Sequence, residues 1–158
     1  MKNRRLVIGY GNPLRGDDGL GWEVAGRLAA NIADESVTIM AVHQLTPELA
    51  EPVSQAEMVI FVDASYEGKP GTWSCEKVTP APATTQPLGH HFGIPGLLAY
   101  ARAIFDANPR AFVVSVAAES FECHTILSPV VEMVLSEIVR HIRNTIEFPN
   151  YNPEVTYA

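Results

Sequence analysis

The sequence has few cysteines, few positive charges and no long hydrophobic run. Its 158 residues include only two cysteines, Cys75 and Cys123, which are too few for a disulfide scaffold and lack the spacing of a zinc site. Lysine and arginine number 11 against 18 aspartate and glutamate residues, which gives a formal net charge of −7. This acidic balance argues against a nucleic-acid partner and against docking on an anionic membrane surface.

The sequence also lacks the patterns that direct or insert a chain into a membrane. The apolar run at residues 6–8, after the charged start, is too short for the hydrophobic region of a signal peptide. No stretch approaches the roughly 20 apolar residues of a membrane span. We therefore expect no membrane insertion, and we expect a soluble protein of the reducing cytoplasm.

Short apolar runs alternate with helical patterns along the chain. Runs typical of buried strands lie at 5–9, 37–42, 58–63, 71–78 and 111–117. Helices are expected to begin near residues 20, 47, 94 and 129, and the last is predicted to continue unbroken through Met133 and Ile142. This alternation predicts a single three-layer α/β domain, in which helices cover both faces of a twisted, mostly parallel sheet. We assign residues 1–146 to this domain and 147–158 to a C-terminal tail.

The loop after the first predicted strand is rich in glycine and acidic residues. The pair Gly9-x-Gly11 stands between a strand and a helix, as in dinucleotide-binding proteins, but Leu14 stands where that fingerprint has its third glycine. Asp17 and Asp18 would also repel a pyrophosphate at the start of the helix. We expect one of these carboxylates to cap the helix and the other to face a cleft. A nucleotide-binding α/β protein is thus the less favoured alternative.

Further polar residues follow the other predicted strands. Asp63 ends the third apolar run, and His90 and His91 stand at the end of a long predicted loop. Because ligands bind at the carboxyl ends of the strands in such sheets, these residues are candidates for one site with Asp18, although Asp63 could instead form a turn. Two carboxylates and an imidazole suit a divalent metal such as nickel, zinc or cobalt, and three protein ligands leave positions open for substrate.

Other candidates have simpler explanations. The segment His43-Gln44-Leu45-Thr46 follows the second strand at the same sheet edge and is either a plain connection or part of the site. His124 and His141 are expected to be surface or packing residues. The chain has no Gly-x-Ser-x-Gly elbow, and adjacent Cys123 and His124 make a poor nucleophile and base, so serine and cysteine hydrolases are disfavoured. Five scattered histidines also do not form the histidine-rich tract of a nickel carrier.

In combination, these segments resemble the hydrogenase maturation proteases, the endopeptidases that trim the large subunit of [NiFe] hydrogenases. The resemblance rests on Gly9-Tyr10-Gly11-Asn12-Pro13-Leu14-Arg15-Gly16-Asp17-Asp18-Gly19-Leu20-Gly21, His43-Gln44-Leu45-Thr46-Pro47-Glu48-Leu49, Val62-Asp63-Ala64, His90-x-x-Gly93 and Leu127-Ser128-Pro129. It implies a phosphorylase/hydrolase-like sheet and places the metal contacts of the family at Asp18, Asp63 and His90. The neighbouring His91 is the alternative imidazole.

The resemblance implies removal of the C-terminal extension of a [NiFe] hydrogenase large-subunit precursor after nickel insertion. Asp18, Asp63 and His90 would complete the coordination of nickel carried by the precursor, and zinc or cadmium are other ions for these ligands. Residues 43–46 would govern substrate selectivity. Either the metal polarises the scissile carbonyl or a carboxylate activates water, as in an aspartic-type peptidase. We expect a monomer, and the main alternative is a non-enzymatic nickel-binding maturation factor.

Overall fold

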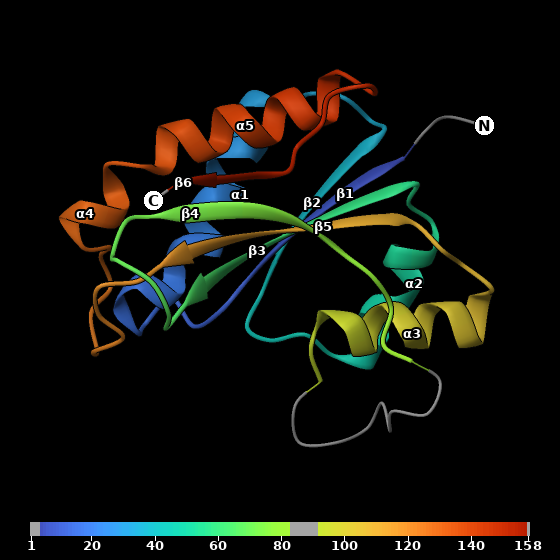
Figure 1. Ribbon diagram of the computed structural model, residues 1–158, viewed down its shortest axis with the longest axis horizontal. Coiled ribbons are helices and arrows are strands. Elements are labelled where there is room, and N and C mark those ends of the chain that lie inside the picture. Colours follow the sequence, from blue (N-terminus) through green and yellow to red (C-terminus); the bar gives the residue numbers. More distant parts are fainter. Residues whose placement is uncertain (1–3, 83–91, 158) are drawn as a thin grey trace.

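A six-stranded sheet forms the centre of the computed structural model, which describes residues 4–82 and 92–157 (Figure 1). The strand order is β2-β1-β3-β5-β4-β6. Strands β2, β1, β3 and β5 are parallel, whereas β4 is antiparallel to β5 and β6 is antiparallel to β4. The strands are β1 (Arg5–Tyr10), β2 (Val37–Val42), β3 (Met58–Ser65), β4 (Trp73–Val78), β5 (Arg110–Ala117) and β6 (Val155–Tyr157).

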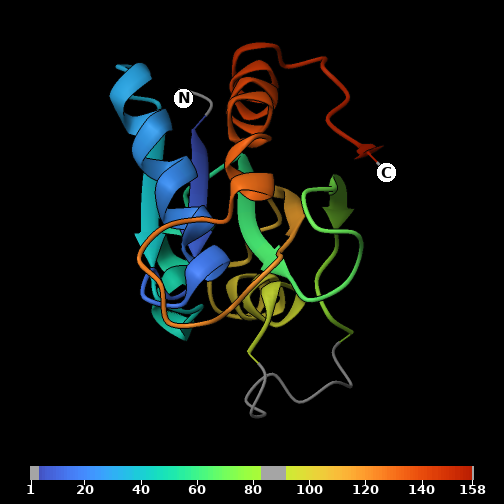
Figure 2. The same ribbon diagram turned by 90° about the vertical axis from the view of Figure 1, so that its left-hand side faces the viewer.

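Helices cover both faces of this sheet, as Figure 2 shows. One face is covered by α1 (Leu20–Asn31), α4 (Pro129–Glu132) and α5 (Leu135–Glu147), and the other by α2 (Ala50–Ser54) and α3 (Ile94–Phe105). Two 3-10 turns, η1 (Gly16–Gly19) and η2 (Pro47–Leu49), precede α1 and α2. This arrangement confirms the predicted three-layer α/β fold with a mostly parallel sheet. Among the helices of the described residues, none is long and apolar enough to cross a bilayer.

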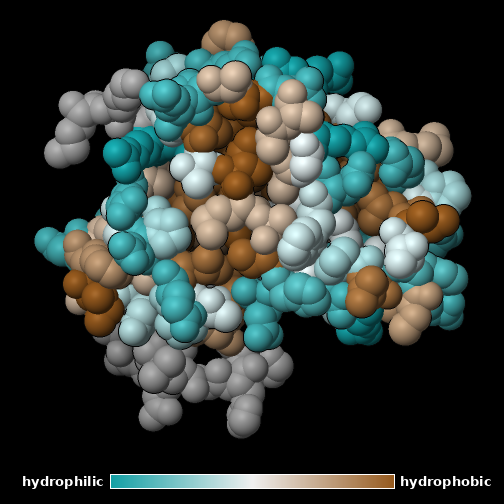
Figure 3. Space-filling model, turned by 180° about the vertical axis from the view of Figure 1, so that it is seen from behind, coloured by the Kyte–Doolittle hydropathy of each residue, from teal (hydrophilic) through white to brown (hydrophobic). Residues whose placement is uncertain are grey.

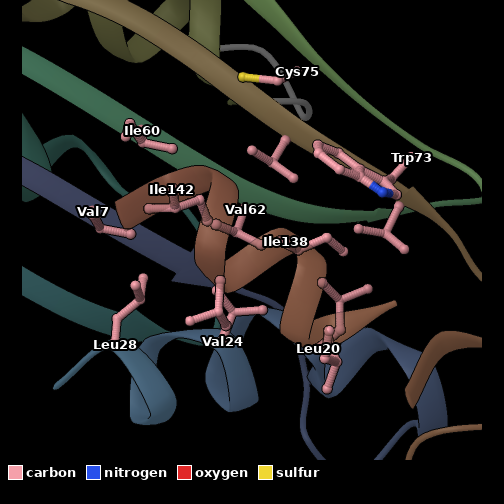
Figure 4. Close-up of a cluster of buried hydrophobic side chains, with 14 of the residues drawn as sticks. Val7, Leu20, Val24, Leu28, Ile60, Val62, Trp73, Cys75, Ile138 and Ile142 are labelled. Carbon is pink, nitrogen blue, oxygen red and sulfur yellow. The ribbon is translucent and has the colours of Figure 1, made fainter. Parts of the chain in front are cut away.

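Alternating side chains of the central strands supply two hydrophobic cores. Val7 and Ile60 point toward α1 and α5, whereas their neighbours Ile8 and Phe61 point toward α2 and α3. All four are at most 1% exposed, and burying one such side chain contributes about 1.5–3 kcal/mol to folding. Figure 4 shows the first core, where side chains of α1 and α5 meet those of the strands: Leu20, Val24, Leu28, Ile138, Ile142, Val7, Ile60, Val62, Trp73 and Cys75.

The last predicted helix is not continuous. Helix α4 ends at Glu132, and α5 begins at Leu135 after two residues outside both helices. The Val134 N–H donates to the carbonyl of Val131, three residues earlier, whereas an α-helix uses the carbonyl four residues earlier. The turn is therefore narrower here, and the α-helical spacing is interrupted. Met133, expected within the helical pattern, is 82% exposed. The prediction of one unbroken helix was therefore wrong, because hydrophobic spacing alone does not reveal a tightened turn.

The segment after residue 147, expected as a tail, adds the sixth strand. Residues 155–157 pair with residues 73–75 of β4, which supplies partners for an otherwise open edge. His141 of α5 holds the chain before this strand: its Nε2 donates to the Pro153 carbonyl at 2.9 Å, and its ring packs edge-on against Trp73. His141 is thus a buried packing residue, as predicted, and His124 is exposed, also as predicted.

Strand β2 forms the opposite edge of the sheet. It lies at the back of Figure 1, and the view from behind shows hydrophobic residues reaching the surface in the middle of that face (Figure 3). Its side chains are mostly half-buried: Ile39 packs toward the core under α1, and Met40 toward the core under α2 and α3. The carboxyl end of β2 leads directly into residues 43–46.

Candidate functional site

Glycines allow the first loop to pack closely against the end of β1. A Cβ on Gly9 would lie 2.0 Å from the carbonyl oxygen of Gly21, so the start of α1 is in direct backbone contact with β1. Gly11 has φ of +141°, and a Cβ there would lie 2.1 Å from the Asp18 carbonyl oxygen. Both glycines of the Gly9-x-Gly11 pair therefore have a role in backbone packing that requires no phosphate.

Asp18 lies in turn η1, where the first loop approaches the carboxyl edge of the sheet. Its Oδ2 accepts a hydrogen bond from the Asn12 backbone N–H at 2.7 Å. The Asn12 side chain in turn accepts the Leu14 N–H at 2.9 Å, so the loop is folded back on itself. The Trp22 indole N–H donates to the Gly11 carbonyl at 2.9 Å and ties the loop to α1. The half-buried Asp18 carboxylate is thus held by local backbone contacts.

Asp63 lies inside β3 and pairs with Ser115 of β5, because the strand continues two residues beyond the predicted end. It is therefore a strand residue and does not form a turn. Burial raises the pKa of its carboxyl to about 6; the Tyr10 hydroxyl bound to it acts in the opposite direction, and the charge of Asp18 raises it further. Burial and the charge of Asp63 raise the pKa of Tyr10 well above its ordinary value, so its hydroxyl remains a donor.

One cleft of about 540 Å³ lies at this edge of the sheet and contains several of the predicted residues. It is lined by Tyr10, Gly11, Asp18, His43, Gln44, Leu45, Thr46, Pro47, Asp63, Phe92 and Gly93. The structure thus places both candidate carboxylates and the proposed selectivity segment around one space. Two acidic side chains there create a negative potential that attracts a cation.

The imidazole of the predicted set cannot be placed in the same way. His90 and His91 lie outside the described residues, although Gly93 of the His90-x-x-Gly93 match lines the cleft. Within the ranges 4–82 and 92–157, no three histidine, cysteine or acidic side chains are close enough to hold a metal ion. Among the described residues, Asp18 and Asp63 are the members of the predicted set that line the cleft.

The structure corrects the predicted helix cap and gives Asp17 and Tyr10 contacts that the sequence did not predict. Helix α1 has Gly19 at its N-cap and no side-chain cap, so neither Asp17 nor Asp18 caps it. Asp17 is buried and turns toward the loop after β5, whereas Tyr10 contacts Asp63. Sequence reasoning missed both roles. For Tyr10 a signal existed, because its position at the end of β1 beside the end of β3 follows from the parallel order.

Comparison with known proteins identifies relatives of the same fold. The hydrogenase maturating endopeptidase HybD from E. coli is 25% identical, with a TM-score of 0.76 over 93% of this chain and 94% of that one. The hydrogenase 2 maturation peptidase from a Thaumarchaeota archaeon is 26% identical, with a TM-score of 0.70 over 90% and 97%. The [NiFe] hydrogenase maturation protease HycI from Thermococcus kodakarensis, 19% identical with a TM-score of 0.75 over 92% and 94%, supports the fold alone.

No protein-family model and no curated protein matches the chain. The structural likeness nevertheless extends over about 93% of its length and reaches 25–26% identity with solved enzymes. It involves the same family whose motifs are present in the sequence. Solved hydrogenase maturation endopeptidases are thus structural relatives of this chain, and the resemblance to that family is confirmed.

Proposed function

We propose that this protein is an endopeptidase that removes the C-terminal extension of a [NiFe] hydrogenase large-subunit precursor. The observation that carries the proposal is the pair of carboxylates, Asp18 and Asp63, in one cleft of a chain whose structural relatives are named hydrogenase maturation endopeptidases. Those relatives support a peptidase with a role in hydrogenase maturation. The enzyme acts as a monomer on its precursor in the cytoplasm, the compartment that the composition predicts.

Nickel carried by the precursor is part of the proposed substrate. The cysteines of the precursor hold the ion, and Asp18, Asp63 and His90 complete its coordination. Burial and the charge of Asp18 both disfavour ionisation of Asp63, and a divalent cation would relieve both effects. A precursor without nickel lacks this contact and docks poorly. Zinc and cadmium suit the same ligands.

Cleavage of the peptide bond requires an activated water. In the metal-free cleft the pKa of Asp63 is about 6, so its carboxyl is mostly ionised at neutral pH and is ready either to bind the nickel or to accept a proton from water. The hydroxyl of Tyr10, at the end of β1, donates a hydrogen bond to this carboxylate and holds it in place. No serine or cysteine side chain lines the described part of the cleft, and the proposed reaction needs neither. These features support an aspartic-type assignment.

Residues 43–46 are proposed to select the precursor. They line the cleft beside both carboxylates, and His43 packs edge-on against Trp22, which is bonded to the first loop. Side chains at this wall can contact the part of the precursor around the scissile bond without binding the metal. Specificity between precursors then follows from the shape and polarity of this wall.

The experiment that tests the proposal compares carboxylate variants with a matched surface control. Nickel-loaded precursor is incubated with the wild-type protein, Asp18→Asn, Asp63→Asn or Asp34→Asn, and the products are analysed by mass spectrometry. Asp34 is an acceptor for Ser36 in an exposed turn. We expect a shortened precursor with the wild type and with Asp34→Asn, and losses of at least about 100-fold with the other two variants. Nickel binding without any shortened product would favour the non-enzymatic maturation factor.

A further inference from the structure

Asp17 precedes the candidate ligand Asp18 but contacts a different part of the molecule. Its side chain has no exposed surface. The carboxylate accepts backbone hydrogen bonds from Glu119, Ser120 and Ser128 at 2.8, 3.2 and 2.7 Å, and a fourth from the Ser128 hydroxyl at 2.8 Å. All of these donors lie in the segment between β5 and α4, which we call the 118–128 loop. One carboxylate therefore joins two segments that are far apart in the sequence.

Backbone contacts strengthen the same connection. The Gly16 N–H donates to the His124 carbonyl at 2.8 Å, and the Asp17 N–H donates to the Ser120 carbonyl at 3.0 Å. Both sides of the connection are rigid peptide groups, and their hydrogen bonds have preferred directions. The start of turn η1 is thus fixed in orientation as well as in place.

Asp18 depends on this turn for its own position. Its N–H donates to the Arg15 carbonyl at 3.2 Å, and its carboxylate accepts the Asn12 N–H at 2.7 Å. These contacts are all local, so they hold Asp18 within the first loop but do not connect that loop to the 118–128 loop. Asp17, one peptide bond away, connects the first loop to the 118–128 loop together with the Gly16 N–H. A rotation of the turn at Asp17 would therefore turn the Asp18 carboxylate relative to the cleft.

We propose that Asp17 is a positioning residue, which fixes turn η1 to the 118–128 loop and thereby aims the Asp18 carboxylate into the cleft. The inference rests on the proposed function of the cleft. A buried carboxylate is a poor choice for mere space filling, because an apolar side chain of similar size packs there without a desolvation cost. What the carboxylate adds is direction, since several donors must converge on its two oxygens.

The test uses Asp17→Asn, which keeps the size of the side chain but turns an N–H₂ group toward backbone donors. Ser128→Ala is the milder variant, because it removes only the hydroxyl donor to Asp17 and leaves the backbone donors in place. Asp34→Asn makes the same chemical change in an exposed turn. Each full-length variant is assayed for kcat and KM on nickel-loaded precursor at a temperature where circular dichroism shows it folded.

A second readout follows Asp18 directly and does not depend on activity. The Asn12 backbone N–H donates to the Asp18 carboxylate, so its NMR chemical shift and hydrogen exchange report where that carboxylate lies. Asn12 has no contact with Asp17 among the hydrogen bonds of the described residues. A purely structural role of Asp17 in the 118–128 loop would leave the Asn12 signal and kcat per folded molecule unchanged.

We expect Asp17→Asn to lower kcat at least tenfold with little change in KM, and to shift the Asn12 signal and speed its exchange. Ser128→Ala should lower kcat about threefold and move the same signal less. If Asp17→Asn does not fold, the result with Ser128→Ala tests the positioning role of Asp17. Wild-type kcat together with an unmoved Asn12 signal in a folded variant would overturn the inference. A moved Asn12 signal in a protein whose wild type cleaves no precursor would instead uphold the positioning role and overturn the proposed function.

Discussion

Replacing Asp63 with asparagine should stabilise the protein while it abolishes cleavage. Asparagine keeps the shape of the side chain, and its oxygen can accept the hydrogen bond from Tyr10, but the buried negative charge is lost. In the folded protein burial raises the pKa of Asp63 from 3.8 to about 6. That difference corresponds to about 3 kcal/mol, at about 1.4 kcal/mol for each pH unit. Because the cleft is open to solvent, we expect a gain of about 1–3 kcal/mol at pH 7.

The pH dependence of this gain has a definite sign. In the unfolded chain the carboxyl loses its proton near its ordinary pKa, whereas in the folded chain it keeps the proton until about pH 6. Ionisation of Asp63 therefore lowers the free energy of unfolding as the pH rises from about 4 through about 6. Asp63→Asn has no carboxyl to ionise at this position, so its free energy of unfolding does not fall in this way. Its gain in stability over the wild type should therefore be largest at about pH 7 and below about 1 kcal/mol at about pH 4.

Urea unfolding followed by circular dichroism measures both quantities, and the precursor assay measures activity. Asp34→Asn serves as the control, because it removes an exposed charge outside the cleft. It should show no gain in stability and retain full activity. Easier unfolding of Asp63→Asn than of the wild type at neutral pH, or cleavage of precursor at the wild-type rate, would contradict these expectations.

Four further predictions concern other parts of the molecule. Burial lowers the pKa of His141, against the opposing hydrogen bond to Pro153, so the free energy of unfolding should fall as the pH drops below about 6.5. Urea unfolding at about pH 5 and about pH 7.5 should show a smaller fall in the free energy of unfolding for His141→Gln than for the wild type. Exchange of residues 43–46 for another sequence should change which precursor is cleaved in competition assays; loss of cleavage of every precursor by a folded variant would make the segment catalytic. Chelator treatment of the enzyme alone should leave activity on nickel-loaded precursor intact, and tight metal lost together with activity would indicate an ordinary metallopeptidase. His90→Ala should abolish processing whereas His91→Ala retains most of it, and the reverse pattern would move the ligand by one residue.

Much of the fold follows from the sequence because buried parallel strands have a strong pattern. The run at residues 58–62 is apolar on both faces, as a central strand requires, and the structure places it between β1 and β5. The position of Asp63 at the carboxyl edge follows from the same pattern, since ligand-binding residues gather where parallel strands end. Asp18 follows from its place after the first strand. These two predictions needed only local sequence and a topological rule.

The features that escaped prediction depend on contacts between distant segments or on backbone detail. The donors to Asp17 lie 102 to 111 positions away, and nothing local distinguishes this residue from a helix cap. The break between α4 and α5 rests on one tightened backbone bond. The pairing of residues 155–157 with β4 depends on an open sheet edge, which exists only after the rest of the sheet has formed. Patterns of hydrophobicity carry none of this information.

Nickel on the precursor is proposed to direct cleavage by this protein. The most direct measurement incubates the purified wild-type protein with equal amounts of nickel-loaded and nickel-free precursor and follows the mass of each over time. We expect the loaded precursor to lose a C-terminal peptide while the nickel-free precursor remains intact. Equal cleavage of the two would contradict nickel recognition, and absence of cleavage in both would contradict the proposed peptidase.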